Sequence, residues 1–249
     1  MTNHPADDWD RHWTEISPAS DIAPSTRYRR RVIERMLEID APGDGARVLE
    51  IGSGTGSFAE LFVPRYPKAR FLGLDLSATG VRMASRKIPS AEFRQRDLLK
   101  PAGPDDRTEF GATHALASEV LEHLDDPVTL LRNSMPYMAP GCRLIVTVPG
   151  GPISAFHEHI GHRRHYTPES LRGVLENAGF AVERAHGIGY PFFNLYLSLL
   201  IWRGEKAIAQ VSGEPGLAVR AASVVFNTLF RFNSMKSGWQ MVAVARYRG

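Results

Sequence analysis

The stretch Val48–Gly56 has the sequence VLEIGSGTG, and it decides the fold of this chain. A short apolar run, Arg47–Ile51, overlaps the first half of this stretch and starts one residue before it. Such a run is typical of a buried strand. Glycine then recurs at every second residue, and apolar residues return at helical spacing from Phe58 up to Pro64. Strand, glycine turn and helix in this order indicate the first unit of a parallel α/β sheet, because parallel strands need crossover helices.

Strand and helix patterns alternate along most of the chain, so we predict an α/β fold with a seven-stranded, mostly parallel sheet flanked by helices. The predicted strands are Arg47–Ile51, Phe71–Leu76, Glu92–Arg96, Ala112–Ser118, Arg143–Val148, Phe180–Ala185 and Gln240–Tyr247. The predicted helices include Thr26–Ile39, Ala78–Lys87, Pro127–Met138 and a helix capped by Thr167 that ends at Gly179, and a turn at Pro140-Gly141 precedes the fifth strand.

The 249 residues suit one domain that carries an insertion. We divide it into an N-terminal helical segment (1–44), a core (45–189), an apolar helical insertion before the last strand (190–238) and the last strand (239–249). Within the insertion, two helical stretches are predicted around Leu195–Ala209 and Leu217–Phe232.

Composition sets few limits on function. A hydrophobic fraction of 43% and a charged fraction of 23% are ordinary for a globular protein. The net charge of +3 comes largely from two basic clusters, around Arg29 and at Arg163-Arg164, which we interpret as solvated faces, so nucleic acid is not an expected partner. A single cysteine, Cys142, excludes an internal disulfide, and the polar, acidic N-terminus lacks an export signal, so we expect a cytoplasmic protein.

The glycine turn and a following acid point to a nucleoside ligand. Gly52, Gly54 and Gly56 let the backbone approach a ligand closely, and Asp75 ends the second strand about 20 residues on, where a carboxylate accepts both ribose hydroxyls. The dinucleotide-binding fingerprint G-x-G-x-x-G would need a residue such as glycine or alanine at position 57, where this chain has Ser57. A carboxylate at Glu50 favours instead a nucleoside with a positive sulfonium centre.

Four segments together resemble the successive motifs of class I S-adenosylmethionine methyltransferases. They are Val48–Gly56 (VLEIGSGTG), Gly73–Ser77 (GLDLS), Arg96–Leu98 (RDL) and Ser118–His123 (SEVLEH), and they span roughly residues 45–150. The resemblance implies a Rossmann-like fold, methyl transfer and S-adenosyl-L-methionine as cofactor. The chain is similar to the ubiquinone-pathway O-methyltransferase-like branch, whose acceptors are small molecules.

The resemblance also implies a cofactor-binding set. The three glycines of the turn would lie against the amino-acid and ribose parts of the cofactor, Asp75 would hold the ribose hydroxyls, and Asp97 with Leu98 would meet adenine. For Asp97 the alternative is a turn-forming aspartate after a strand. The whole expected set is Glu50, Gly52, Gly54, Gly56, Asp75, Leu76, Asp97, Leu98 and Ser118.

The segment Glu119–His123 follows the fourth strand at the edge where open α/β sheets bind ligands. It is similar to the E-x-x-E-H metal motif of ubiquinone-pathway O-methyltransferases and small-RNA 2′-O-methyltransferases, which implies Mg²⁺ on Glu119, Glu122 and His123. The alternative is that no metal binds and that His123 acts as a base or packs. A base is needed where the acceptor is a hydroxyl that must lose its proton.

A second histidine source follows the fifth strand, where His157–Tyr166 is dense in imidazole. Gly161-His162 resembles the loop glycine-histidine of quinone methyltransferases, so His162 is the first candidate there for a base, a metal ligand or a hydrogen-bond donor. Surface histidines without a role in chemistry are the alternative. The catalytic candidates are therefore His123, His162 and Glu119.

The apolar insertion, Tyr190–Phe232, leaves three interpretations open. It could be a lid over a lipid-like acceptor, a surface that contacts a membrane peripherally through Arg203, Lys206, Arg220 and Arg231, or a packing element against the sheet or a second copy of the chain. The leading hypothesis is an O-methyltransferase for a hydroxylated small-molecule or lipid-like acceptor. The rivals are an RNA methyltransferase and a non-catalytic cofactor-binding subunit.

Overall fold

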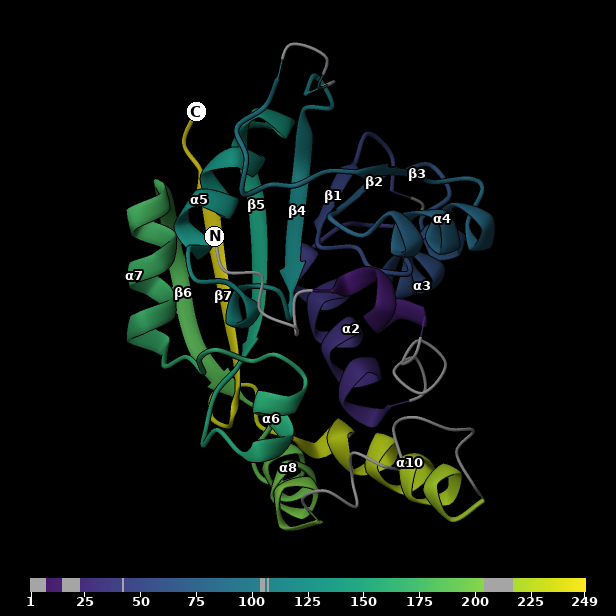
Figure 1. The fold of residues 1–249 in the computed structure, drawn as a ribbon, viewed down its shortest axis with the longest axis vertical. Helices are drawn as coiled ribbons and strands as arrows, with labels where there is room; N and C mark the ends of the chain where they lie inside the picture. The colour runs from purple at the N-terminus through teal and green to yellow at the C-terminus, as the bar shows by residue number, and fades with distance from the viewer. Residues whose placement is uncertain (1–7, 15–22, 42, 104–105, 107, 204–216) are drawn as a thin grey trace.

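A computed structural model describes residues 8–14, 23–41, 43–103, 106, 108–203 and 217–249. Its centre is a seven-stranded sheet in the order β3-β2-β1-β4-β5-β7-β6 (Figure 1). Only β7 runs antiparallel to its neighbours, which confirms the expected mostly parallel sheet. The strands are β1 (Arg47–Ile51), β2 (Arg70–Asp75), β3 (Glu92–Gln95), β4 (Ala112–Ser118), β5 (Met138–Pro149), β6 (Phe180–Ile188) and β7 (Gln240–Tyr247).

Helices cover both faces of the sheet, as crossover connections between parallel strands require. Helices α2 (Pro24–Leu37) and α3 (Ser57–Arg65) contribute Ile33 and Phe62 to a buried cluster on one face. Helices α5 (Pro127–Ser134) and α7 (Pro168–Ala178) contribute Leu131 and Leu175 to the cluster on the other face. Helix α4 (Ala78–Lys87) packs beside β2 and β3.

Two boundaries in the middle of the chain differ from the predicted ones. The predicted helix Pro127–Met138 ends as α5 at Ser134 and continues as the 3₁₀ turn η3 (Met135–Tyr137), because Pro136 has no backbone N–H for a helical hydrogen bond. The predicted turn at Pro140-Gly141 lies inside β5. Gly141 has a φ of +81°, and the pairing register with β4 shifts there, so the backbone bulges and the strand resumes.

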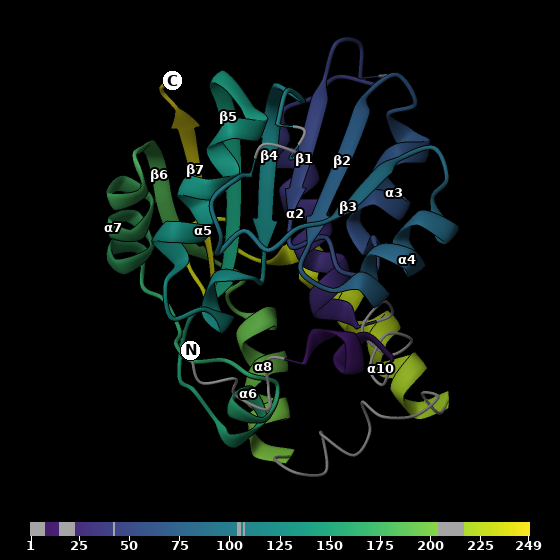
Figure 2. The same cartoon turned by 45° about the horizontal axis from the view of Figure 1, so that its top comes forward.

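The insertion forms helices α8 (Phe192–Arg203) and α10 (Leu217–Leu229), followed by the 3₁₀ turn η4 (Phe230–Phe232). The last residues of the first predicted stretch, 204–209, lie outside the described residues. With the short helix α6 (Ala155–His159), these helices gather at the end of the molecule toward which β4 and β5 point (Figures 1 and 2). None of the helices in the described ranges combines the length and the apolar character that a membrane span needs.

One side of the insertion belongs to the hydrophobic core of the protein. The ring of Phe193 is buried against those of Tyr28 and Phe230, with centroids 5.3 and 5.5 Å away. Tyr196 of α8 packs edge to face on Phe226 of α10, at 5.2 Å. The packing interpretation therefore holds for this side, and it anchors α8 and α10 to α2 and to the sheet.

Candidate active site

The glycine turn after β1 is held by Asp75 at the end of β2. The backbone N–H of Gly54 donates to one carboxylate oxygen of Asp75 at 2.7 Å, and that of Ser77 donates to the other at 2.8 Å. Gly52, Gly54 and Gly56 all have positive φ, between +50° and +75°, which side chains other than glycine rarely adopt. The predicted glycine turn and Asp75 thus form one hydrogen-bonded unit at the carboxyl edge of the sheet.

Two buried carboxyl groups lie under this turn. Burial raises the pKa of Asp75, although the hydrogen bonds from Ser77 and Gly54 oppose that rise. Burial also raises the pKa of Glu50 well above its usual range, opposed by the nearby guanidinium of Arg30. One Glu50 oxygen has no hydrogen-bond partner among the described residues. A buried acceptor of this kind is costly unless a ligand or water satisfies it.

A cavity opens beside the turn, between β1, β2 and β4. Seven of the predicted site residues line it: Gly52, Asp75, Leu76, Asp97, Leu98, Glu119 and His123. The alternative prediction for Asp97, a turn-forming aspartate, also holds, because its carboxylate accepts a hydrogen bond from the backbone N–H of Leu99 at 3.0 Å. Ser118 is not in the lining, and its hydroxyl shares a hydrogen bond with Thr147 at 2.9 Å.

The sequence interpretation missed one wall of this cavity, the helical segment 9–14. Trp9 and Trp13 line the cavity, and the Trp13 indole lies so close to Gly54 that a Cβ there would come within 2.5 Å of it. The Asp10 carboxylate accepts hydrogen bonds from the Ser77 hydroxyl at 2.5 Å and from the Thr79 backbone N–H at 2.8 Å. The signal in the sequence was the aromatic-acidic motif WDRHW at residues 9–13.

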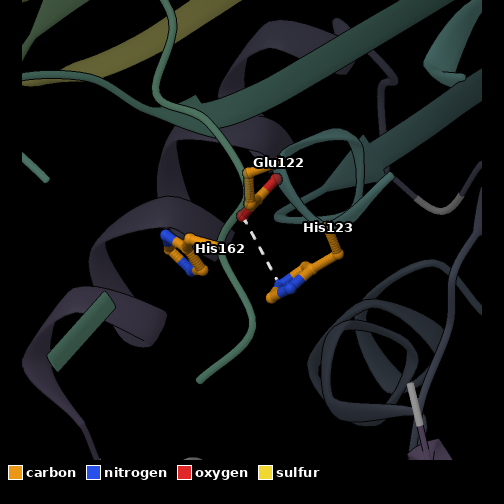
Figure 3. A group of neighbouring side chains, drawn as sticks. All are labelled: Glu122, His123 and His162. Atoms are coloured by element: carbon orange, nitrogen blue, oxygen red, sulfur yellow. Dashed lines mark ion pairs between the residues drawn. The ribbon is translucent and has the colours of Figure 1, made fainter. Parts of the chain in front are cut away.

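A cluster of Glu122, His123 and His162 lies next to the cavity (Figure 3). Potential ligand atoms of the three side chains all lie within 4.8 Å of one another, and His123 Nε2 is 3.9 Å from Glu122 Oε1. The segment 121–123 forms a 3₁₀ turn, η2, after β4, whereas His162 arrives from the loop after α6. The fold therefore brings together residues about 40 positions apart, two of which had been predicted as catalytic.

Hydrogen bonds fix which imidazole nitrogens carry lone pairs. Carbonyl oxygens only accept, so Nδ1 of His123 donates to Gly161 O at 3.1 Å and Nδ1 of His165 donates to Gly151 O at 3.0 Å. Nε2 of His165 must then accept from Nδ1 of His162, 3.2 Å away. Nε2 therefore carries the lone pair in both His123 and His162, so each can offer this nitrogen to a metal ion, and His123 could also accept a proton there.

The electrostatics of the cluster disfavour the charged forms of its side chains. Burial, together with His123 and the other nearby imidazoles, lowers the pKa of His162 to about 2. Burial and His165 lower the pKa of His157 to about 4. Glu122 is fully buried, both of its carboxyl oxygens have no hydrogen-bond partner among the described residues, and burial with the nearby Glu119 raises its pKa well above the usual range.

Glu119 has a different environment from the other two predicted metal ligands. Its carboxylate forms an ion pair with Arg29 at 3.6 Å and accepts a hydrogen bond from Gln240 at 2.9 Å. Its φ of +56° is a strained conformation for a side chain of this size, costing about 1–3 kcal/mol. The candidate metal-binding cluster consists of Glu122, His123 and His162 and does not include Glu119. Glu119 lines the cavity instead, and its contacts connect the end of β4 to α2 and β7.

The basic pair of the histidine loop is engaged within the protein. Arg163 forms an ion pair with Asp125, and the Arg164 guanidinium donates to the Asp125 carbonyl at 3.1 Å. These contacts hold the loop against the segment after η2, and they agree with a structural role for this basic cluster.

The fold is shared with solved structures of different activity. Phosphoethanolamine N-methyltransferase 2 of Haemonchus contortus, solved with S-adenosyl-L-methionine, superposes with a TM-score of 0.65 at 13% identity, covering 98% of this chain and 60% of that one. The cyclase SpnF superposes with a TM-score of 0.62 at 17% identity, covering 96% and 94%. At such identities the likeness establishes the fold alone.

Sequence comparison is more specific. A trans-aconitate 2-methyltransferase of Azoarcus sp. (strain BH72) is 35% identical over 126 residues, 50% of this chain and 46% of that relative. The chain spans less than half the length of this and other curated relatives that it matches. A family model described as a methyltransferase domain matches residues 24–185, more than half of the chain. With its sheet order and its glycine turn, the chain belongs to the methyltransferase domain family.

Proposed function

We propose that this protein transfers a methyl group from S-adenosyl-L-methionine to an oxygen atom of a small-molecule acceptor. One observation carries the proposal: the cavity beside the glycine turn is lined by both Asp75 and His123. A nucleoside held by Asp75 in this cavity would share it with the imidazole of His123. Family membership supports methyl transfer, and the histidines support oxygen as the methylated atom.

The cofactor would be held mainly by backbone and carboxylate groups. Asp75 would accept the ribose hydroxyls, and Asp97 with Leu98 would border adenine. The buried carboxyl group of Glu50, with one unsatisfied oxygen, lies close enough to Asp75 to raise its own pKa further. Two carboxyl groups beneath the turn suit a cofactor that carries a positive sulfonium.

Methyl transfer is an in-line displacement at a carbon that the sulfonium already activates, so alignment supplies much of the rate. The new bond forms between the acceptor oxygen and the methyl carbon as the carbon–sulfur bond breaks. For a hydroxyl acceptor, His123 Nε2 would take the proton, because its Nδ1 proton is already donated to Gly161. Trp9, with its ring centroid 4.8 Å from that of His123, would restrict the imidazole to this orientation.

A second candidate acceptor is a carboxylate. The relatives named trans-aconitate 2-methyltransferase support a small organic acid as the acceptor. A carboxylate is already deprotonated at neutral pH, so it would need a positioning cation and no base. The histidine cluster gives no advantage to such an acceptor, and for this reason we favour a hydroxyl.

A metal ion fits the cluster as well. Glu122 offers two buried oxygens without a hydrogen-bond partner among the described residues, and His123 and His162 each offer Nε2. Two imidazole nitrogens and one carboxylate suit a transition-metal dication such as Mn²⁺, Fe²⁺ or Zn²⁺ better than the Mg²⁺ that the motif resemblance implies, since Mg²⁺ prefers oxygen. Such an ion would lower the pKa of a nearby acceptor hydroxyl.

Incubation with methyl-labelled S-adenosylmethionine tests the proposal. We expect label to pass to members of a panel of phenols, catechols and hydroxylated lipids at least about tenfold faster than to trans-aconitate, because a base is of use only to the hydroxyl acceptors. The Asp75→Asn variant serves as the blank. Label on trans-aconitate alone would favour the carboxylate acceptor, and binding of the cofactor without transfer to any acceptor or to host extract would favour a non-catalytic subunit.

Chelation separates a metal role from a base role. If the cluster holds a metal ion that turnover needs, dialysis against a strong chelator is expected to lower turnover at least about tenfold, and Mn²⁺ or Zn²⁺ to restore it better than Mg²⁺. The bound ion would be measured in parallel by elemental analysis of the wild type and of Glu122→Gln. Unchanged turnover in a protein shown to be metal-free would exclude the metal and leave His123 as the base.

A further inference from the structure

The outward side of the insertion is an exposed apolar surface. On α8, Leu195, Leu199 and Trp202 follow one another at helical spacing, and their side chains are 49%, 40% and 82% exposed. Val224 and Val225 of α10 and Phe232 of η4 are also exposed. We call these six residues the outer face. Large apolar side chains exposed on two helices that contact each other, as α8 and α10 do, mark a candidate interaction surface on a folded protein.

Helix α8 has the composition of a helix that is surrounded on all sides. Its sequence, FFNLYLSLLIWR, is mostly apolar, interrupted only by Asn194, Ser198 and the terminal Arg203, and a helix that is apolar over most of its surface is normally enclosed by protein or lipid. Within the described part of the chain, protein encloses the side of α8 on which Phe193 joins the core. At twelve residues it is too short to cross a bilayer, so the remaining apolar side would lie along an interface.

Among the described residues of α8, α10 and η4, every charged side chain is positive. Helices α8 and α10 and the turn η4 contain no aspartate or glutamate, but they contain Arg203, Arg220 and Arg231. Burial lowers the pKa of Arg31, and the nearby guanidiniums of Arg231 and Arg27 lower it further, so these three arginines from α2 and η4 lie close enough to repel one another. Among the described residues, none of these three forms an ion pair with a carboxylate. Positive charges left in mutual repulsion beside an apolar surface are complementary to anionic groups.

We propose that the outer face docks on a membrane surface rich in anionic phospholipids. The six apolar side chains would enter the boundary between headgroups and acyl chains, and Arg27, Arg31 and Arg231 would bind lipid phosphates. The edge of the sheet that holds the cavity and the histidine cluster faces the same end of the molecule (Figures 1 and 2). An acceptor dissolved in the membrane would therefore reach the site without crossing water. The docking is independent of the proposed chemistry, since it concerns the surface alone.

Co-sedimentation with vesicles tests the docking without measuring methyl transfer. We expect the full chain to partition at least about tenfold more strongly onto vesicles of equal parts phosphatidylglycerol and phosphatidylcholine than onto pure phosphatidylcholine at about 0.1 M salt. The Leu199→Glu/Trp202→Glu variant should lose about tenfold or more of this binding, and Arg31→Gln and Arg231→Gln about fivefold each. The matched controls are Leu61→Glu, a similarly exposed apolar position on α3, and Arg248→Gln next to the C-terminus, which lies at the opposite end of the molecule from α8 and α10 (Figure 1).

Several outcomes would overturn the proposal. Equal binding to neutral and anionic vesicles, or equal losses in the control variants, would show that the outer face and its arginines do not direct binding. Light scattering without vesicles tests whether a second copy of the chain binds the outer face instead. A wild-type dimer that the Leu199→Glu/Trp202→Glu substitutions dissociate, together with no vesicle binding, would assign the face to such a copy. Because all substituted side chains are exposed, thermal melts of the variants should match the wild type.

Discussion

Replacement of Asp75 by asparagine is expected to weaken binding of S-adenosylmethionine by about a hundredfold or more. The ribose hydroxyls would lose charge-assisted hydrogen bonds, each worth about 1.5–3 kcal/mol. The asparagine amide also presents one N–H₂ group where the native carboxylate accepts from Gly54 or Ser77, so the glycine turn would lose one of its two anchors. Calorimetric titration with S-adenosylhomocysteine, which does not react, measures the affinity directly.

The matched control for this substitution is Asp44→Asn. Asp44 is an aspartate remote from the cavity whose ion pair with Lys68 is exposed, so its loss should leave cofactor affinity unchanged. A thermal melt of both variants separates loss of binding from loss of folding. Wild-type affinity in a folded Asp75→Asn protein would refute the ribose assignment.

Replacement of His123 by asparagine is expected to lower turnover by about 10² to 10⁴ while leaving cofactor affinity within about twofold. The asparagine side-chain amide can still donate to the Gly161 carbonyl, as Nδ1 of the histidine does, so the loop remains attached. The lone pair of Nε2, which faces Glu122, is removed. Single-turnover kinetics with saturating cofactor would isolate the chemical step.

His186→Asn on β6 provides the control for the loss of one imidazole elsewhere in the protein. It should retain full turnover, because His186 belongs neither to the cavity lining nor to the cluster. Should His123→Asn retain more than about a third of the turnover with hydroxyl acceptors, neither a base nor a metal at this position contributes to the rate.

The sheet was largely predictable because its signals are local. Three strands, Arg47–Ile51, Ala112–Ser118 and Gln240–Tyr247, have the predicted bounds, since each is an apolar or alternating run bordered by residues that break strands. The helix α7 begins and ends as predicted because its Thr167 capping box and the left-handed Gly179 are specified by the residues themselves. The bulge in β5 was missed because a proline-glycine pair predicts a turn unless the pairing strand is known.

The site was predictable only in part, because its parts come from separate segments. The glycine turn and Asp75 are recognisable by type and spacing, and so is the pair of Glu122 and His123. Sequence alone could propose His162 but could not show which side chains it meets, since a loop of ten residues offers many paths. The contribution of Trp9 and Trp13 depends on how a segment far from the glycine turn in the chain folds back over it, and no local pattern encodes that contact.

The anchoring of segment 9–14 has a kinetic consequence. Trp9 and Trp13 line the cavity, and the Asp10 carboxylate between them accepts two hydrogen bonds at the first turn of α4. If a bound nucleoside leaves past this wall, these bonds must open first, and the dwell time of the spent cofactor would then depend on their stability. Because Trp9 also contacts His123, each such opening would expose this imidazole to water.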